Sequence, residues 1–256
     1  MPDLTDEQRN EVNRLLRTYL NRARKTEDLY REGQVEQDLS NFFSGIASRY
    51  QKGAICCASQ RTVEEAQGHF RTASKYFLQS AQESNIGVMS TNSLTRGIYT
   101  AALAGDSDGI RELAELTRKL HETADVDPSE WVADRFYLSG CLAGAVTGDI
   151  VETEIESLEA VNETKPPVHA LYGSAILSFV KALDESDPEG VKRGIQRMVE
   201  YHVEEYPSDD IFGLLMAPQA TALFVIAKSS GFEVTVDSEH VPTGLVESAV
   251  LALKSS

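Results

Sequence analysis

The stretch AALAGD, residues 101–106, decides how the chain folds. A run of small side chains ends at Gly105, and Asp106 precedes a new apolar-periodic stretch, IRELAELTRKL, at 110–120. Glycine tolerates the left-handed backbone conformation that ends a helix, and aspartate is favoured as the cap of the next helix. The stretch therefore predicts a helix, a tight turn and a second helix.

The same break recurs twice along the chain. The phrase LAGAVTGD at 142–149 repeats it at Asp149, and Asp187 followed by Pro188 gives a third copy. The three aspartates lie about 40 residues apart, a spacing typical of helical-hairpin repeats. In each unit a helix rich in small residues precedes a shorter amphipathic partner. We therefore predict an all-α fold of stacked antiparallel helical hairpins, a repeat-like array of about ten or eleven helices.

The flanking segments extend this array, and we expect one all-helical domain over residues 1–256. Its N-terminal helices are expected in 1–60 and the hairpin stack in 61–204. The remaining residues, 205–256, are expected to form C-terminal helices with a short extended segment. That segment is FEVTV at 232–236, which alternates like a short strand or extended chain.

Start signals mark several of these helices. Thr5 and Gln8 have the spacing of a capping box, in which each side chain bonds the backbone N–H of the other. Thr62 begins a second copy of that pattern. Asp127 followed by Pro128 predicts another helix start, because proline at the first helical position loses no helical hydrogen bond.

The composition indicates a folded protein with an acidic surface. The 256 residues are 41% hydrophobic and 25% charged, and 40 acidic against 24 basic residues give a formal net charge of −16. Such a field repels phosphate backbones and anionic lipid, so we expect neither nucleic acid nor a membrane as the partner. Because the acidic residues are scattered, they favour a solvating surface, as in the salt-rich cytoplasm of a halophile. The alternative is complementarity to a basic partner.

The sequence predicts a cytoplasmic protein. Its first residues, MPDLTDEQRN, are polar and do not resemble a signal peptide. No apolar run reaches the roughly 20 residues that span a bilayer. Cys56 and Cys57 are adjacent and Cys141 is distant, a spacing that forms neither a C-x-x-C motif nor a zinc knuckle, so we expect buried free thiols.

The sequence contains no catalytic, cofactor-binding or metal-ligating constellation. The glycines at the breaks lack the flanking residues of a phosphate-binding loop. His202 lies near Glu204 and Glu205, and at a helix C-terminus we expect it to interact with the helix dipole or with solvent. Asp209 and Asp210 invite comparison with aspartate-rich magnesium sites, but capping at a helix start is the favoured interpretation.

Arg96 is the one charged residue that stands out. It lies in SLTRGIYTAALAGD at 93–106, on a helix otherwise made of small and apolar residues. We expect it to form a buried ion pair with an acid on an adjacent helix or to reach the surface; the alternative is a contact with a binding partner. Four aromatic residues are expected in the core rather than on a recognition surface: Trp131, Phe136, Tyr137 and Tyr172.

Two longer stretches carry a family resemblance. YFLQSAQESNIGVMSTNSLTRGIYTAALAGDSDGIRELAEL at 76–116 and AKSSGFEVTVDSEHVPTGLVE at 227–247 resemble the all-helical immunity proteins of bacterial polymorphic toxin systems, specifically immunity protein family forty-nine. The features that carry it are the apolar spacing, the Ala-Gly-Asp turn and the valine-proline tail. The resemblance implies a non-enzymatic protein without a cofactor that binds a cognate toxin and blocks it.

Three hypotheses about function follow. The favoured one is toxin neutralisation by surface occlusion, in which an acidic helical stack meets a basic toxin. A helical-repeat scaffold or adaptor would instead have a concave groove lined by the first helices of successive hairpins. A helical enzyme would require carboxylates or histidines that converge on a central cavity.

Overall fold

Helices form nearly all of the regular structure in the computed structural model, which describes residues 4–36, 38–84, 87–206 and 210–255. These described residues contain eleven α-helices, one short 3₁₀ helix at Val88–Ser90 and no strand, so the all-α prediction is confirmed. The α-helices are α1 (Asp6–Arg31), α2 (Leu39–Ser59), α3 (Val63–Glu83), α4 (Thr91–Ala104), α5 (Ser107–Thr123), α6 (Ala133–Thr147), α7 (Glu152–Asn162), α8 (Pro167–Asp184), α9 (Pro188–Glu205), α10 (Pro218–Ser229) and α11 (Thr243–Lys254).

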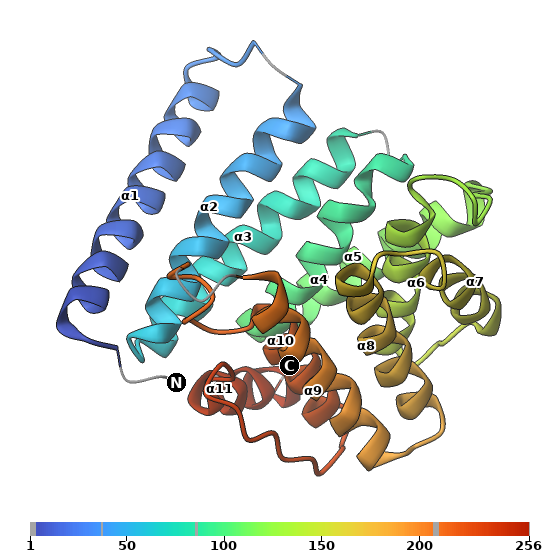
Figure 1. Cartoon of the computed structure of the whole chain (residues 1–256). Coiled ribbons are helices and arrows are strands. Elements are labelled where there is room, and N and C mark those ends of the chain that lie inside the picture. The colour runs from blue at the N-terminus through green and yellow to red at the C-terminus, as the bar shows by residue number, and fades with distance from the viewer. Residues whose placement is uncertain (1–3, 37, 85–86, 207–209, 256) are drawn as a thin grey trace.

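Consecutive helices pack against one another along the chain. Helices α1 to α4 lie in a row, with α1 at its outer edge, and the later helices continue beyond α4 (Figure 1). Helix α4 is the most embedded element, because it contacts α3, α5 and α6 and also α10 and α11 from the end of the chain. The C-terminal helices therefore close the stack against its middle.

Two of the three predicted breaks form as expected. Gly105 adopts a left-handed conformation with φ 63° at the end of α4. The carboxylate of Asp106 then accepts a hydrogen bond of 3.1 Å from the backbone N–H of Gly109. Asp187 caps α9 in the same way, accepting 3.1 Å from the N–H of Glu189. These breaks give the helix pairs α4–α5 and α8–α9.

The expectation for Asp149 is wrong. Gly148 ends α6 with φ 73°, as predicted, but the residue that caps α7 is Val151. Ile150 packs against the core, and residues 149–151 belong to no helix before α7 begins at Glu152. The carboxylate of Asp149 instead accepts a hydrogen bond of 2.5 Å from the guanidinium of Arg118.

The capping boxes have different outcomes. At Thr5 the box is complete, since Gln8 Oε1 accepts 2.8 Å from the Thr5 N–H and the Thr5 hydroxyl oxygen accepts 3.3 Å from the Gln8 N–H. At Thr62 it is absent, because that hydroxyl donates to the carbonyl of Cys57 at 2.9 Å. The Thr62 hydroxyl therefore joins the backbone N–H groups of Gln60 and Thr62 on the Cys57 carbonyl at the end of α2.

The helix start predicted at Asp127 is also wrong. The Asp127 carboxylate accepts a bond of 2.8 Å from the N–H of Ser129 within a turn, and α6 begins only at Ala133. The turn moves Trp131 away from the core, where it was expected, and leaves it 71% exposed. Phe136, on the helix proper, is buried as predicted.

Buried apolar side chains form two clusters. The larger extends through the stack from α1 to α11. The three cysteines are free thiols and buried, as expected, and burial raises the pKa of Cys56 to about 12. The smaller cluster joins α1, α2 and α3 and consists of Ala23, Phe42, Phe43, Ile46, Ala47, Tyr50, Ala73 and Phe77.

Residues 232–236 form neither a helix nor a strand among the described residues, so the short strand is not observed and the extended segment stays a prediction. No described helix has both the length and the apolar character required to cross a membrane. The division into one domain with segments 1–60, 61–204 and 205–256 stays a prediction.

Candidate functional site

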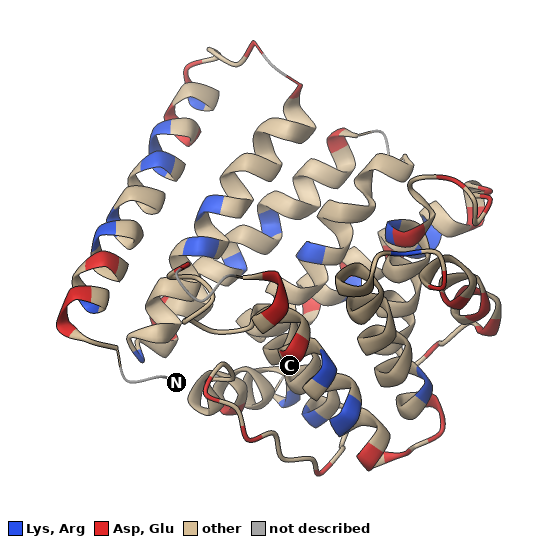
Figure 2. Ribbon diagram, in the orientation of Figure 1, with Lys and Arg blue, Asp and Glu red and all other residues tan. Residues whose placement is uncertain are grey.

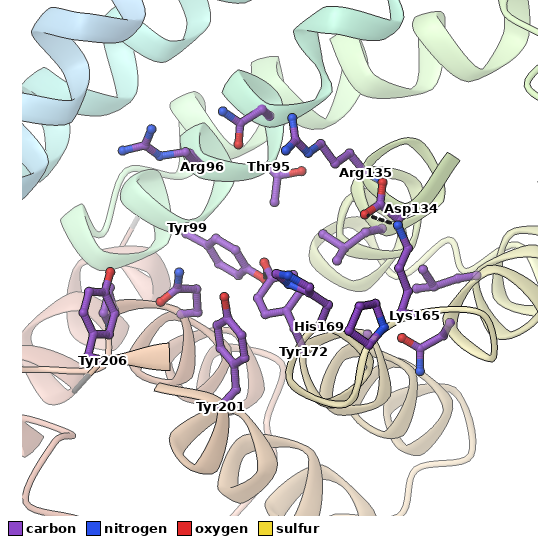
Figure 3. A pocket seen from close by; sticks show the side chains of 18 of the residues that line it. Thr95, Arg96, Tyr99, Asp134, Arg135, Lys165, His169, Tyr172, Tyr201 and Tyr206 are labelled. Carbon is purple, nitrogen blue, oxygen red and sulfur yellow. Dashed lines mark hydrogen bonds and ion pairs between the residues drawn. The ribbon is translucent and has the colours of Figure 1, made fainter. Parts of the chain in front are cut away.

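A pocket of about 730 Å³ lies where the first helices of three successive pairs, α4, α6 and α8, converge (Figure 3). Parts of α2, α7 and α10 and the end of α9 complete its walls. Ligand pockets in proteins typically measure roughly 300–1,000 Å³, so the volume suits a small molecule or a few side chains of a partner. The repeat predicted from the sequence therefore builds one concave site.

Each of the three helices lines the pocket with one face. Residues spaced by three, four and seven positions share a face of an α-helix. On α4 these residues are Asn92, Thr95, Arg96 and Tyr99. On α6 and the turn before it they are Trp131, Asp134, Arg135 and Leu138, and on α8 and the residue before it Pro166, His169, Tyr172 and Gly173.

Arg96 and Arg135 occupy equivalent positions in two of these helices. Arg96 stands seven residues before the Leu-Ala-Gly at 103–105, and Arg135 stands seven residues before the Leu-Ala-Gly at 142–144. Sequence analysis singled out Arg96 but missed Arg135. Arg135 could have been found by aligning the two repeats on Leu-Ala-Gly rather than on the aspartate that follows.

Arg96 is half-buried on α4 and lines the pocket. Its guanidinium donates a hydrogen bond of 2.5 Å to Gln51 Oε1 and lies 4.5 Å from the centre of the Phe77 ring. It forms no ion pair with an acid in the part of the chain that the structure describes, and its role in partner binding stays a prediction. Burial lowers the pKa of Arg96, and the guanidinium still stays charged at neutral pH.

Aromatic side chains supply much of the remaining lining. The Tyr99 and Tyr172 hydroxyls lie 3.1 Å apart, and the rings of Tyr172 and Tyr201 lie 4.9 Å apart. Burial raises the pKa of Tyr201 to about 12, so this hydroxyl keeps its proton and can donate it in a hydrogen bond. Figure 3 shows these tyrosines around the pocket. The aromatic lining residues are Tyr99, Trp131, Tyr172, Tyr201, Tyr206 and Phe212.

The charge of the pocket is opposite to that of the whole chain. Its described lining residues include four basic side chains, Lys52, Arg96, Arg135 and Lys165, and two carboxylates, Asp134 and Asp210. One basic group is already neutralised, because Lys165 Nζ lies 2.8 Å from the Asp134 carboxylate. Figure 2 shows acidic residues at many turns around the edge of the view and basic positions on α2 and α4 near its middle.

Thr95 has an unsatisfied polar atom at the pocket wall. It is 7% exposed, and its hydroxyl finds no hydrogen-bond partner among the described residues. A buried polar group without a partner costs about 1–3 kcal/mol. A polar group of a bound partner that reached this hydroxyl would remove that cost.

The other residues considered at the sequence level do not assemble into a catalytic or metal site. His202 is 2% exposed rather than solvated, and its ring lies 5.4 Å from that of His240. Asp209 lies outside the described residues, and Asp210 belongs to a turn, since α10 begins only at Pro218. Within the described ranges no group of three or more His, Cys, Asp or Glu is arranged to hold a metal ion.

Comparison with known proteins gives one match. A family model described as immunity protein 49 matches residues 47–245 of the chain. Searches of curated proteins and of solved structures returned no match. The matched region contains every described residue that lines the pocket and excludes helix α1.

Proposed function

Because the chain belongs to the immunity protein 49 family, we propose that it binds a cognate toxin protein and neutralises it by occluding the toxin's surface. The observation that carries this proposal is the match over residues 47–245, since membership in a family of immunity proteins implies a protein partner that is a toxin. The same membership supports a non-enzymatic binding role.

The pocket formed by α4, α6 and α8 is the proposed docking site for the toxin. Tryptophan, tyrosine and arginine are the residue types that dominate binding energy at protein interfaces, and the pocket contains all three. Trp131 is 71% exposed at this site, although an aromatic ring of its size gains most from being buried. A partner segment seated in the pocket would cover it.

The acidity of the chain fits an encounter with a basic toxin. A net charge of −16 attracts a positively charged protein over a Debye length and raises the association rate. We expect that rate to fall as salt is added, because salt screens the attraction.

Coexpression with the toxin encoded by an adjacent reading frame tests the proposal. The chain is expected to restore growth and to copurify with the toxin. Trp131→Ala is expected to weaken binding about 30-fold, the equivalent of the 2 kcal/mol that marks an interface hot spot. Leu251→Ala is the matched control, because Leu251 is 69% exposed on α11 and lies outside the family match. If the wild-type chain neither protects against the toxin nor copurifies with it, the proposal is contradicted.

A second candidate is a helical-repeat adaptor that holds a peptide without inhibiting it. The observation in its favour is that the first helices of successive pairs line the pocket, as that hypothesis expected. The two functions differ in outcome, because an adaptor would copurify with its partner and leave a toxin fully active.

A further inference from the structure

We propose that the pocket accepts an acidic segment of the partner protein, with one of its carboxylates seated against Arg135 and the hydroxyl of Thr95. The inference rests on the proposed function, because it names the chemistry by which the same partner is recognised. It differs from the encounter with a basic toxin, which concerns the outer surface of the stack.

The first argument is the set of basic groups left without a carboxylate. Among the described residues, Lys52, Arg96 and Arg135 form no ion pair, although the chain has 40 acidic residues to supply one. Arg96 is held by Gln51 and stacked on Phe77, whereas the guanidinium of Arg135 has no hydrogen-bond partner in the described chain. Arg135 therefore keeps its full capacity to bind a carboxylate with two parallel hydrogen bonds.

The second argument is the buried hydroxyl of Thr95. Thr95 projects from α4 into the pocket, and Arg135 reaches back from α6 toward α4 (Figure 3). Because the Thr95 hydroxyl lacks a partner, it can donate to a carboxylate that Arg135 holds. The Tyr201 hydroxyl offers a further donor on another wall of the pocket.

The third argument selects a peptide segment over a small anion. The lining also contains two exposed aromatic rings, those of Trp131 and Tyr206, which are 71% and 37% exposed. An inorganic anion would leave these groups in contact with water, whereas an aromatic or aliphatic residue next to the carboxylate would cover them. The expected segment therefore pairs Asp or Glu with a large apolar residue.

The fourth argument is selectivity over the rest of the molecule. With a net charge of −16, the outer surface repels an acidic segment. Basic groups outnumber carboxylates in the pocket lining, so the same segment is attracted to this one place. Opposite fields on the surface and in the pocket thus fix where the segment binds.

Trp131 provides a direct assay, because it is the only tryptophan of the 256 residues and it lines the pocket. The full chain is titrated with the peptide acetyl-Gly-Glu-Phe-Glu-Gly-amide while Trp131 emission is recorded. The glutamate peptide is expected to change the emission saturably and to bind at least about tenfold more tightly than its glutamine analogue, as expected for a charged pair against a neutral one. Equal affinity for the two peptides, or no response to millimolar glutamate peptide, would overturn the inference.

Substitutions locate the binding groups. Arg135→Gln leaves the fold intact because Arg135 is exposed, and it is expected to weaken the glutamate peptide about tenfold. Thr95→Val keeps the side-chain volume and is expected to weaken it about fivefold. Arg111→Gln removes the same charge from the exposed face of α5 outside the pocket, and it should bind as the wild type does. Wild-type affinity in Arg135→Gln, or equal losses in Arg111→Gln, would refute the site.

Two further results separate this inference from simple anion binding and from the proposed function. If inorganic phosphate alone displaces the glutamate peptide at comparable concentration, the pocket is a small-anion site and the inference is wrong. If the wild-type chain protects against the toxin while Arg135→Gln and Thr95→Val bind the toxin with unchanged affinity, the inference fails and the proposed function stands. If the wild type gives no protection, the proposed function fails, whatever the peptide does.

Discussion

His202 lies on α9 with only 2% of its surface exposed. Burial is the main reason why its pKa is lowered to about 4; the neighbouring ring of His240 lowers it further, and the backbone of Gly213 opposes the shift. The folded protein therefore holds His202 as a neutral imidazole. Sequence analysis expected His202, near the end of its helix, to interact with the helix dipole or with solvent. The helical period already placed it on the inward face, because it lies four residues after Met198 and seven after Ile195, both buried.

The buried imidazole predicts a loss of stability in mild acid. The pKa of His202 is lowered from 6.5 to about 4 on folding, so the unfolded chain takes up the proton first as pH falls. The contribution of neutral His202 to the free energy of unfolding is fully present above about pH 6.5. It is lost progressively down to about pH 4, by about 3 kcal/mol in all.

Chemical denaturation at pH 7 and pH 5 measures this loss. His202→Phe is expected to lose less free energy of unfolding between the two pH values than the wild type. His169→Gln is the control, because His169 is exposed, and it should keep the wild-type difference. If His202→Phe loses as much free energy of unfolding between pH 7 and pH 5 as the wild type, His202 is not the group responsible for the loss.

At the scale of the helical elements, the breaks at Gly105 and Gly148 show which part of a helical repeat can be predicted from the sequence. Gly105 and Gly148 both end a helix in the left-handed conformation, as their sequence context predicts. The start of the following helix depends instead on whether the next side chains pack, and Ile150 delays α7 after the second break. Helix ends were thus predictable from local chemistry, whereas several helix starts were decided by tertiary contacts.

The caps at these breaks should differ in energy. Asp106→Ala removes a true N-cap and is expected to lower the free energy of unfolding by about 1 kcal/mol. Asp149→Ala removes only an exposed contact with Arg118 and is expected to change it by less than about 0.5 kcal/mol. Equal losses in thermal or urea unfolding would show that Asp149 caps a helix after all.

Close packing between α8 and α9 predicts a second contrast. A Cβ atom at Gly194 would lie 2.7 Å from the backbone nitrogen of Phe179, so Gly194→Ala is expected to destabilise the fold by about 1–3 kcal/mol. A Cβ atom at Gly68 on α3 would meet no atom within 4 Å. Gly68→Ala should therefore stabilise by about 0.5–1 kcal/mol, as expected for alanine in a helix interior. Urea unfolding of the two variants checks both signs, and a neutral Gly194→Ala would contradict the packing.

For the whole molecule, the dominant property is its charge. A net charge of −16 destabilises a compact chain by self-repulsion, and salt screens that repulsion as the Debye length shrinks. We therefore expect the melting temperature to rise as potassium chloride increases from 0.02 to 0.3 M, as for a protein adapted to salt. Sucrose at equal osmolality is the control without ionic screening. A melting temperature indifferent to salt would leave partner complementarity as the explanation of the acidity.

The site was only partly accessible from the sequence. Arg96 could be singled out because its charge interrupts a run of small and apolar residues. The repeated breaks predicted the helix pairs. The convergence of α4, α6 and α8 on one pocket could not be predicted, because it depends on how successive helix pairs stack in space. Trp131 was wrongly expected in the core for a local reason, since the turn at Asp127 replaces the expected helix start.

The closing of the stack by α10 and α11 has a consequence for newly made protein. Pro218 and Gln219 on α10 line the pocket, and both C-terminal helices pack on α4. A ribosome must therefore synthesise the chain through α10 before all walls of the pocket can be present, which takes roughly 10–50 seconds for these residues at cellular rates of elongation. Nascent chains that stop before α10 lack part of the pocket wall, so we expect them not to bind the partner.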